Sequence, residues 1–198
     1  NKIDYGYYDI ELGNYNIVSV VEDITMSVLE YIKNKGIELI FDTDTEEEII
    51  ACDPDKIERI ILNLLSNAIK YTRPDGKIIV NINSDKENVY ISVKDTGIGM
   101  PKQKLNKIFN RYEQIDNKLT KSFNGSGIGL SLVKSLVELH GGVVYLEKNV
   151  EQGCEFVIKL PNKILDESKN EEIKSIDIDN KPLIQKVNIE FSDIYELY

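Results

Sequence analysis

Apolar positions recur at helical spacing along three stretches of the chain, and segments of a different pattern separate these stretches. The pair Asp53-Pro54 is a favourable helix start, because aspartate caps the free amides of the first turn and proline suits its first position. Glycines after the last periodic positions are typical of helix ends, and they occur at Gly36 and at Gly141-Gly142. The pattern predicts amphipathic helices over residues 15–33, 53–71 and, after a glycine cluster, 130–140.

Short stretches of alternating apolar and polar residues lie between and after the predicted helices. Residues 85–88 and Gly153 each supply a turn between two such stretches, which predicts two hairpins. Hairpin strands mixed with helices indicate an α+β fold, a two-layer sandwich in which a mixed, mostly antiparallel sheet carries helices on one face. The predicted strands cover residues 37–43, 49–51, 78–82, 89–93, 143–147 and 154–160.

Composition and charge narrow the class of protein. A chain of 198 residues with 41% apolar and 29% charged residues is typical of one globular domain with an appendage. The sequence lacks the run of about eighteen apolar residues that a bilayer-spanning helix needs. A formal charge of −10 argues against nucleic acid or an anionic lipid surface as the main partner. The two cysteines have no metal-ligand spacing and are expected to be reduced thiols, which suits the cytoplasm.

The second predicted helix carries a polar edge beside its apolar stripe. Asn63, Asn67 and Lys70 fall at i, i+4 and i+7, so their side chains share this edge. An amide oxygen is a suitable ligand for Mg²⁺, which relies on phosphate oxygens for much of its coordination, and a lysine supplies positive charge for the phosphates. Taken alone, the same pattern also fits a solvated helix edge.

Two glycine clusters follow the polar helix. Asp95-Thr-Gly-Ile-Gly99 comes directly after a predicted strand, where glycines let the backbone approach a ligand and a buried carboxylate can accept a hydrogen bond from an adenine amine. Gly125-Ser-Gly-Ile-Gly-Leu130 precedes the third helix, whose free amides can bind phosphate. Neither cluster is a Walker A loop or a dinucleotide-binding fingerprint, and each alone also fits a glycine-rich turn.

Together, these segments resemble the catalytic domain of sensor histidine kinases. Asn63-Leu-Leu-Ser-Asn67-Ala-Ile-Lys70-Tyr71 and the two glycine clusters have the order and spacing of that family's motifs. Between the clusters, Ile108-Phe109-Asn-Arg111-Tyr112 resembles the family's phenylalanine-containing box. The resemblance covers residues 15–161. It implies the Bergerat ATP-binding fold, which DNA gyrase, the mismatch-repair ATPase and a heat-shock chaperone share.

The resemblance implies a role for each matching position. Asn67 would hold Mg²⁺, and Asn63 and Lys70 would face the phosphates at the catalytic centre. Asp95 would accept the adenine amine, and Tyr71 would pack on the purine. Residues 110–126 would form a lid over the nucleotide. The other nucleotide-binding positions implied by the resemblance are Gly97, Ile98, Gly99, Phe109, Arg111, Gly125, Ser126, Gly127, Ile128, Gly129 and Leu130.

Position 63 distinguishes a kinase from a hydrolase in this superfamily. The resembling hydrolases carry a glutamate four residues before the magnesium-binding asparagine, and this glutamate activates a water. Asn63 cannot act as a base near neutral pH, whereas an imidazole acceptor is largely a neutral nucleophile there. The chain is therefore expected to transfer the ATP γ-phosphate to a histidine. A serine kinase of the anti-sigma-factor type and a nucleotide-binding regulatory module without transfer activity are the alternatives.

The acceptor histidine is expected outside this chain. The only histidine, His140, lies at the predicted end of the third helix, where an imidazole interacts with terminal carbonyls and the helix dipole. The resemblance places the acceptor on a helical dimerisation domain, of which residues 1–14 are predicted to be the end and the linker. The catalytic domain is predicted over residues 15–161. Residues 162–198 are predicted to form an acidic extension, in which the patterned stretch 187–191 could add a strand to a sheet edge.

The resemblance also implies partners and a location. The parent protein is expected to be a homodimer that passes phosphate to the receiver domain of a response regulator. The chain lacks an initiator methionine, so it is expected to be a fragment of a longer protein. The resemblance implies a cytoplasmic domain, and it leaves open whether the parent protein carries a membrane anchor.

Overall fold

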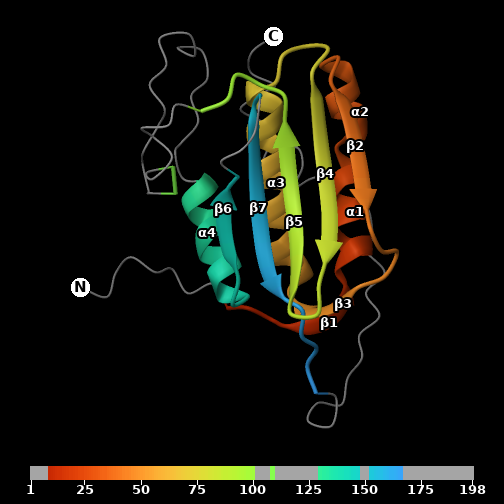
Figure 1. The fold of residues 1–198 in the computed structure, drawn as a ribbon, viewed down its shortest axis with the longest axis vertical. Helices are drawn as coiled ribbons and strands as arrows, with labels where there is room; N and C mark the ends of the chain where they lie inside the picture. The colour runs from red at the N-terminus through yellow and green to blue at the C-terminus, as the bar shows by residue number, and fades with distance from the viewer. Residues whose placement is uncertain (1–8, 101–107, 110–128, 148–151, 167–198) are drawn as a thin grey trace, which may run out of the picture.

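The computed structural model describes residues 9–100, 108–109, 129–147 and 152–166, and the structural statements below concern these residues. Its largest sheet has five strands in the order β2-β4-β5-β7-β6 (Figure 1). β2 pairs with β4 in parallel, and the other neighbouring strands are antiparallel. The strands of this sheet are β2 (Glu38–Thr43), β4 (Lys77–Ser84), β5 (Asn88–Asp95), β6 (Val143–Leu146) and β7 (Cys154–Pro161).

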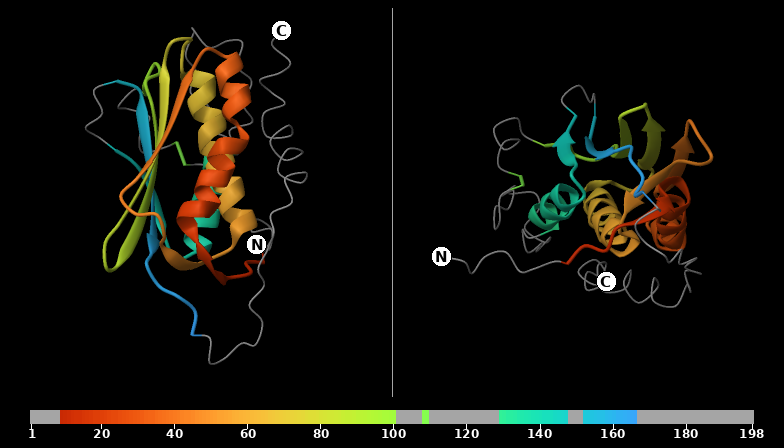
Figure 2. Two further views of the ribbon diagram at one scale, coloured as in Figure 1. Left: turned by 90° about the vertical axis from the view of Figure 1, so that its right-hand side faces the viewer. Right: turned by 90° about the horizontal axis from the view of Figure 1, so that it is seen from below.

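Helices cover one face of this sheet and leave the other face open (Figure 2). α3 is the central helix and contacts both α1 and α4. This arrangement confirms the predicted α+β sandwich with a mixed, mostly antiparallel sheet. The helices are α1 (Ile17–Ser27), α2 (Leu29–Asn34), α3 (Pro54–Tyr71) and α4 (Gly129–Leu139).

Apolar side chains from both layers meet in one core. Successive side chains of a strand point to opposite faces, so alternate residues of β4 and β5 face the helices. Val80 and Val93 are cross-strand partners on this inner face, and both are buried. α3 contributes buried residues at helical spacing, among them Ile57, Ile61 and Leu64. The periodicity that predicts each element therefore also identifies the face that the element buries.

The predicted helix over residues 15–33 begins later than expected. Tyr15 and Asn16 belong to β1 (Gly13–Asn16), which pairs with β3 (Ile49–Cys52) in a separate two-stranded sheet. The Asn16 side chain then accepts a hydrogen bond from the backbone amide of Val18, so Asn16 is the N-cap of α1. Pairing with a strand far along the chain has overridden the local helical pattern at these two positions.

The same predicted helix is also interrupted at Val28, between α1 and α2. The hydroxyl groups of Thr25 and Ser27 donate to the backbone carbonyls of Val21 and Ile24 in the preceding turn. Hydroxyl groups that bond to a preceding turn compete with the backbone ladder and bend helices. Val28 is fully buried at the break, so both helices still contribute to the core.

The other helix ends follow the predicted signals. Asp53 caps α3 by accepting hydrogen bonds from the backbone amides of Asp55 and Lys56. α4 ends at Leu139, and Gly141 has a φ of 74°, a left-handed conformation that glycine adopts without strain. No helix in the described parts of the chain is long and apolar enough to cross a bilayer.

The first and last described segments lie against each other at one end of the molecule. The Asn14 side chain accepts from the backbone amide of Leu165 at 2.7 Å and donates to its carbonyl at 3.0 Å. The backbone amide of Ala51 in β3 donates to the carbonyl of Lys163 at 2.7 Å. Residues 163–165 are therefore hydrogen-bonded to both β1 and β3, and they lie beside the first described segment of the chain.

Candidate functional site

The end of β5 and the end of α3 meet at the predicted adenine-binding residues. Asp95 is only 5% exposed, and its Oδ1 accepts a hydrogen bond from the backbone amide of Gly97 at 2.8 Å. Burial raises the pKa of the Asp95 carboxyl above its usual value, and hydrogen bonds from the backbone amides of Gly97 and Cys154 counteract this shift. The backbone amide of Ile98 donates to the carbonyl of Tyr71 at 3.3 Å, which joins the loop to α3.

Glycine is required where this loop touches its neighbours. A Cβ at Gly97 would lie 2.3 Å from the carbonyl oxygen of Tyr71 and 2.7 Å from Asp95 Oδ1. A Cβ at Gly153 would lie 1.8 Å from the carbonyl oxygen of Asp95. Gly99 has a φ of 70°, which favours glycine. These close approaches hold the Asp95 loop between the last turn of α3 and the start of β7.

Tyr71, Lys70 and Asn67 occupy the last turns of α3 and are half-buried. The Lys70 Nζ lies 5.7 Å from the centroid of the Tyr71 ring, so the cation lies next to the aromatic face. Burial raises the pKa of the Tyr71 hydroxyl, and the neighbouring Cys154 adds to this shift. These residues place an aromatic face, a cation and an amide next to the Asp95 loop.

Asn63 lies where α3 and α4 come together. It is only 8% exposed, and its Nδ2 donates to the carbonyl of Arg59 at 2.9 Å. A Cβ at Gly129, the first residue of α4, would lie 2.5 Å from Asn63 Oδ1. The predicted phosphate-facing asparagine is therefore also a packing residue, and Gly129 allows the close approach of the two helices.

Three further predicted residues lie at the border of the described region. Ile98 is 46% exposed at the tip of the Asp95 loop. Phe109 packs edge-to-face on Phe156 of β7, with ring centroids 6.2 Å apart, and Leu130 is half-buried against the core. The predicted positions Arg111, Gly125, Ser126, Gly127 and Ile128 lie outside the described residues.

Cys154 is a site residue that the sequence did not indicate. It is the cross-strand partner of Asp95, is half-buried, and its charged form would interact with Asp95. Burial raises the pKa of the Cys154 thiol to about 12, and the Asp95 carboxylate adds to the shift. The spacing of cysteines along the sequence carries no sign of this contact, because the register of β5 and β7 creates it.

The polar and charged side chains at this end of α3 suit the binding of an adenine nucleotide. A buried carboxylate can accept a hydrogen bond from the adenine amine, and a nearby cation can compensate phosphate charge. No group of three or more histidine, cysteine, aspartate or glutamate residues in the described ranges could hold a metal ion.

Known proteins with similar sequences are histidine kinases. A family model described as histidine kinase-, DNA gyrase B-, and HSP90-like ATPase matches residues 52–164. The circadian input-output histidine kinase CikA of Synechococcus elongatus is 30% identical over 167 residues, which are 83% of this chain and 22% of CikA. The sensor histidine kinase WalK of Bacillus subtilis is 34% identical over 136 residues, 68% of this chain and 22% of WalK. The chain thus spans about a fifth of the length of these relatives.

Solved structures of histidine kinases share the fold. The catalytic domain of ThkA matches with a TM-score of 0.69 and 27% identity, covering 77% of this chain and 99% of that domain. Full-length ShkA in complex with AMPPNP matches with a TM-score of 0.68 and 27% identity, covering 77% of this chain and 31% of ShkA. ThkA in complex with the response regulator TrrA matches with a TM-score of 0.67 and 26% identity, covering 78% of this chain and 42% of that chain. The chain therefore belongs to the histidine kinase-, DNA gyrase B-, and HSP90-like ATPase family, and its relatives and structural neighbours within that family are histidine kinases and their catalytic domains.

Proposed function

We propose that this chain is the ATP-binding kinase domain of a sensor histidine kinase and transfers the ATP γ-phosphate to a histidine on a separate dimerisation domain. The observation that carries this proposal is the meeting of the buried Asp95 carboxylate with the last turn of α3 through Gly97 and Tyr71. This contact brings an adenine acceptor next to the helix that carries Asn67 and Lys70. The ShkA complex with AMPPNP supports a nucleotide at such a site.

The residues of the site would divide the binding of ATP between them. Asp95 would accept the adenine amine, and the ring of Tyr71 would pack against the purine. Lys70 would compensate phosphate charge, and the amide oxygen of Asn67 would be a ligand of magnesium. When bound, magnesium would supply charge neutralisation at the phosphates. Gly97 and Gly129 allow the close approach of the Asp95 loop to Tyr71 and of α4 to Asn63.

Asn63 favours phosphotransfer over hydrolysis. An amide side chain cannot take a proton from water near neutral pH. Its Nδ2 already donates to the carbonyl of Arg59 within α3, which holds the side chain at the contact with Gly129. A histidine acceptor requires positioning and charge compensation rather than a strong base, because neutral imidazole is itself a nucleophile.

The wider assembly is part of the proposal. The complex of ThkA with TrrA supports a response regulator as the protein that takes the phosphate onward. We propose a dimerisation-domain end and linker in residues 1–14, a catalytic domain centred on residues 15–161 and an acidic extension in residues 162–198. The contacts of Glu11, Asn14, Lys163 and Leu165 attach the inner ends of both flanking segments to the catalytic domain. The parent protein would be a homodimer with this domain in the cytoplasm.

Labelling with γ-labelled ATP and Mg²⁺ tests this function. The purified chain alone should bind ATP but acquire no label, because its one histidine closes α4 rather than facing the phosphates. Adding the separately produced dimerisation domain of the parent protein should give a base-stable, acid-labile label on that domain. Acid-stable label on serine would instead support the serine-kinase alternative. ATP binding without label on any added domain would contradict the kinase proposal.

The nucleotide preference tests the adenine assignment independently of transfer. Calorimetry with ATP and GTP should show tighter binding of ATP in the presence of Mg²⁺. Asp95→Asn should remove most of this preference, because an amide can turn its donor toward the base. Equal affinity of the unaltered chain for ATP and GTP would contradict the role of Asp95.

A further inference from the structure

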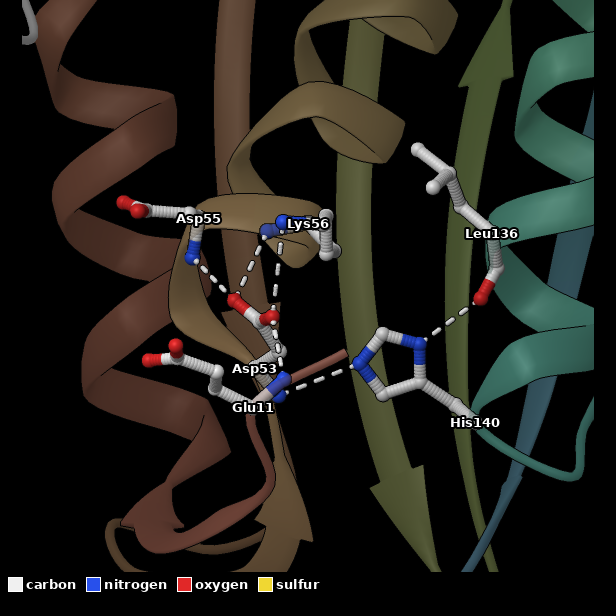
Figure 3. A network of polar contacts seen from close by, with 6 residues as sticks. All are labelled: Glu11, Asp53, Asp55, Lys56, Leu136 and His140. Atoms are coloured by element: carbon white, nitrogen blue, oxygen red, sulfur yellow. Dashed lines mark hydrogen bonds and ion pairs between the residues drawn. The ribbon is translucent and has the colours of Figure 1, made fainter. Parts of the chain in front are cut away.

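A polar network at the N-terminal end of α3 joins segments that are distant in sequence (Figure 3). Its centre is Asp53, which is 5% exposed. Asp53 Oδ1 accepts from the backbone amides of Asp55 at 3.1 Å and Lys56 at 3.2 Å. Asp53 Oδ2 accepts from the backbone amide of Glu11 at 3.0 Å and lies 3.6 Å from Lys56 Nζ. One oxygen therefore caps the helix, and the other holds the segment that precedes β1.

His140 completes this network from the end of α4. Its Nδ1 lies 2.7 Å from the carbonyl oxygen of Leu136, which can only accept, so Nδ1 carries the proton. Its Nε2 accepts a hydrogen bond from the backbone amide of Asp53 at 3.1 Å. The ring is buried and makes both bonds only as the neutral tautomer. The prediction that His140 interacts with a terminal carbonyl of its helix is confirmed, and the bond to Asp53 is an addition.

Two contacts therefore tie α3 to α4. Asp53 and His140 join the start of α3 to the end of α4, and Asn63 meets Gly129 where α4 begins. α3 carries the proposed phosphate and magnesium residues, and α4 begins at Gly129, within the second glycine cluster. The helix pair that surrounds the nucleotide site is thus held at both ends of α4, and Asp53 also holds the incoming chain.

We propose that Asp53 fastens the incoming linker to the nucleotide-binding helix pair, and that Asp53 is a positioning residue for phosphotransfer. The bond from Glu11 to Asp53 and the β1–β3 pairing make residues 11–16 part of the catalytic body. Residues 11–16 then do not add to the length of the connection between this body and an acceptor on the proposed dimerisation domain. A shorter flexible tether raises the effective concentration of the phosphoryl donor at an acceptor on the preceding domain. This inference rests on the proposed function, but its structural part does not require ATP.

Three substitutions separate the contacts of this network. Glu11→Pro removes the backbone amide that bonds Asp53, whereas the matched control Glu11→Ala keeps that amide and removes only the carboxylate. Asp53→Asn preserves helix capping, because asparagine caps as well as aspartate, but it directs an amino group at the Glu11 amide. Glu11→Pro lies outside the helices and sheets of the domain, so it tests the contact even if Asp53→Asn is destabilising.

Hydrogen exchange in the full 198-residue chain, without nucleotide, measures the fastening directly. Glu11→Pro and Asp53→Asn should each raise the exchange rates of the amides in residues 12–16 by about tenfold or more. Residues 12–16 of Glu11→Ala should exchange at the rates of the unaltered chain. In the double variant that combines Glu11→Pro with Asp53→Asn, they should exchange no faster than in the faster of the two single variants. Unaltered exchange in both Glu11→Pro and Asp53→Asn, or equally fast exchange in Glu11→Ala, would overturn the inference.

Kinetics of histidine phosphorylation in the parent protein measure the positioning role. Glu11→Pro and Asp53→Asn should lower kcat about twofold or more and leave the KM for ATP unchanged, because a longer tether dilutes the donor without touching the nucleotide site. An unchanged kcat in variants whose residues 12–16 show fast hydrogen exchange would overturn this role. A KM for ATP that rises by the same factor as kcat falls would also overturn it. If the unaltered parent protein forms no phosphohistidine, the kinase proposal fails while the exchange result still decides the fastening.

Discussion

At the residue scale, the pair Asp95–Cys154 shows how strand register completes the site. The two residues are cross-strand partners in β5 and β7, and the pKa of each is raised by burial. The negative charge of a Cys154 thiolate would also raise the pKa of the Tyr71 hydroxyl. A nucleotide whose adenine binds Asp95 should therefore also cover the Cys154 thiol, because Cys154 is the cross-strand partner of Asp95.

This geometry predicts that ATP protects Cys154 from alkylation. In a Cys52→Ala background, maleimide should modify Cys154 slowly, because a thiol with a pKa of about 12 is rarely a thiolate. ATP at ten times its Kd, with Mg²⁺, should slow the reaction about tenfold by mass action, and GTP should protect less. Mass spectrometry of the modified chain over time gives both rates. Identical rates with and without ATP would place Cys154 outside the nucleotide site.

His140 predicts a pH dependence of stability. Burial, the largest effect, lowers the pKa of His140 below its usual value, and Lys56 acts in the same direction, whereas the hydrogen bond to the Leu136 carbonyl and the Asp53 charge oppose the shift. The unfolded chain then binds this proton first as the pH falls. The contribution of His140 to the free energy of unfolding is complete above about pH 6.5 and is lost as the pH falls through the lower folded pKa.

Urea unfolding at pH 7.5 and 5.5 measures this contribution. His140→Gln cannot be protonated, so the loss of stability between the two pH values should be smaller than in the unaltered chain. Glu138→Gln on the same helix removes an exposed titratable group and serves as a control, which should keep the full loss. A loss of equal size in His140→Gln and the unaltered chain would show that other groups carry the dependence.

At the scale of elements, the contact of the β5 loop with α3 couples binding to packing. A Cβ at Gly97 would meet the carbonyl oxygen of Tyr71 and a carboxylate oxygen of Asp95, so Gly97→Ala must move the loop away from Tyr71. Gly97→Ala should cost about 1–3 kcal/mol of stability, as overpacked sites do. It should also weaken ATP binding by at least about tenfold, because Asp95 moves with the loop.

Gly36→Ala is the matched control for this prediction. Gly36 has a φ of 68° and nothing nearer than 3.8 Å to an added Cβ, so alanine there should cost about 1–2 kcal/mol from backbone strain alone. Calorimetry of ATP binding and urea unfolding on both variants separate the two effects. Unchanged ATP affinity in Gly97→Ala would mean that the loop does not position Asp95 for adenine.

At the scale of the whole molecule, the outgoing segment belongs to the fold. Truncation after Asn162 removes the hydrogen bond from Ala51 to Lys163 and both bonds between Asn14 and Leu165. It should lower the free energy of unfolding by about 1.5–4.5 kcal/mol, because each of the three bonds is worth about 0.5–1.5 kcal/mol. Truncation after Asp166 keeps these bonds, so this chain should be more stable than the shorter one by that amount in urea unfolding. Equal stability of the two truncated chains would show that residues 163–165 are dispensable.

Much of the fold can be predicted from the sequence because its signals are local. The cap at Asp53, the glycine stop at Gly141 and the alternation in β4 and β5 act within a few residues, and each appears in the structure where the pattern indicates. The structure differs from the predicted helix over residues 15–33 at two places, and the causes are a nonlocal strand pairing and side-chain hydrogen bonds. Tyr15 and Asn16 pair with β3, and the hydroxyl groups of Thr25 and Ser27 interrupt the helix at Val28.

Sequence patterns alone identified the family and the class of fold, and they singled out Asn67, Lys70 and Asp95 as candidate site residues. Contiguous motifs carry this information, and helical or strand periodicity places each motif on its element. Tertiary structure alone decided which groups meet. Asp53 and His140 are 87 positions apart, and their bond exists because α3 and α4 pack side by side. Cys154 reaches Asp95 because β7 pairs with β5 in one register, and a shift of one residue would turn its side chain to the other face of the sheet.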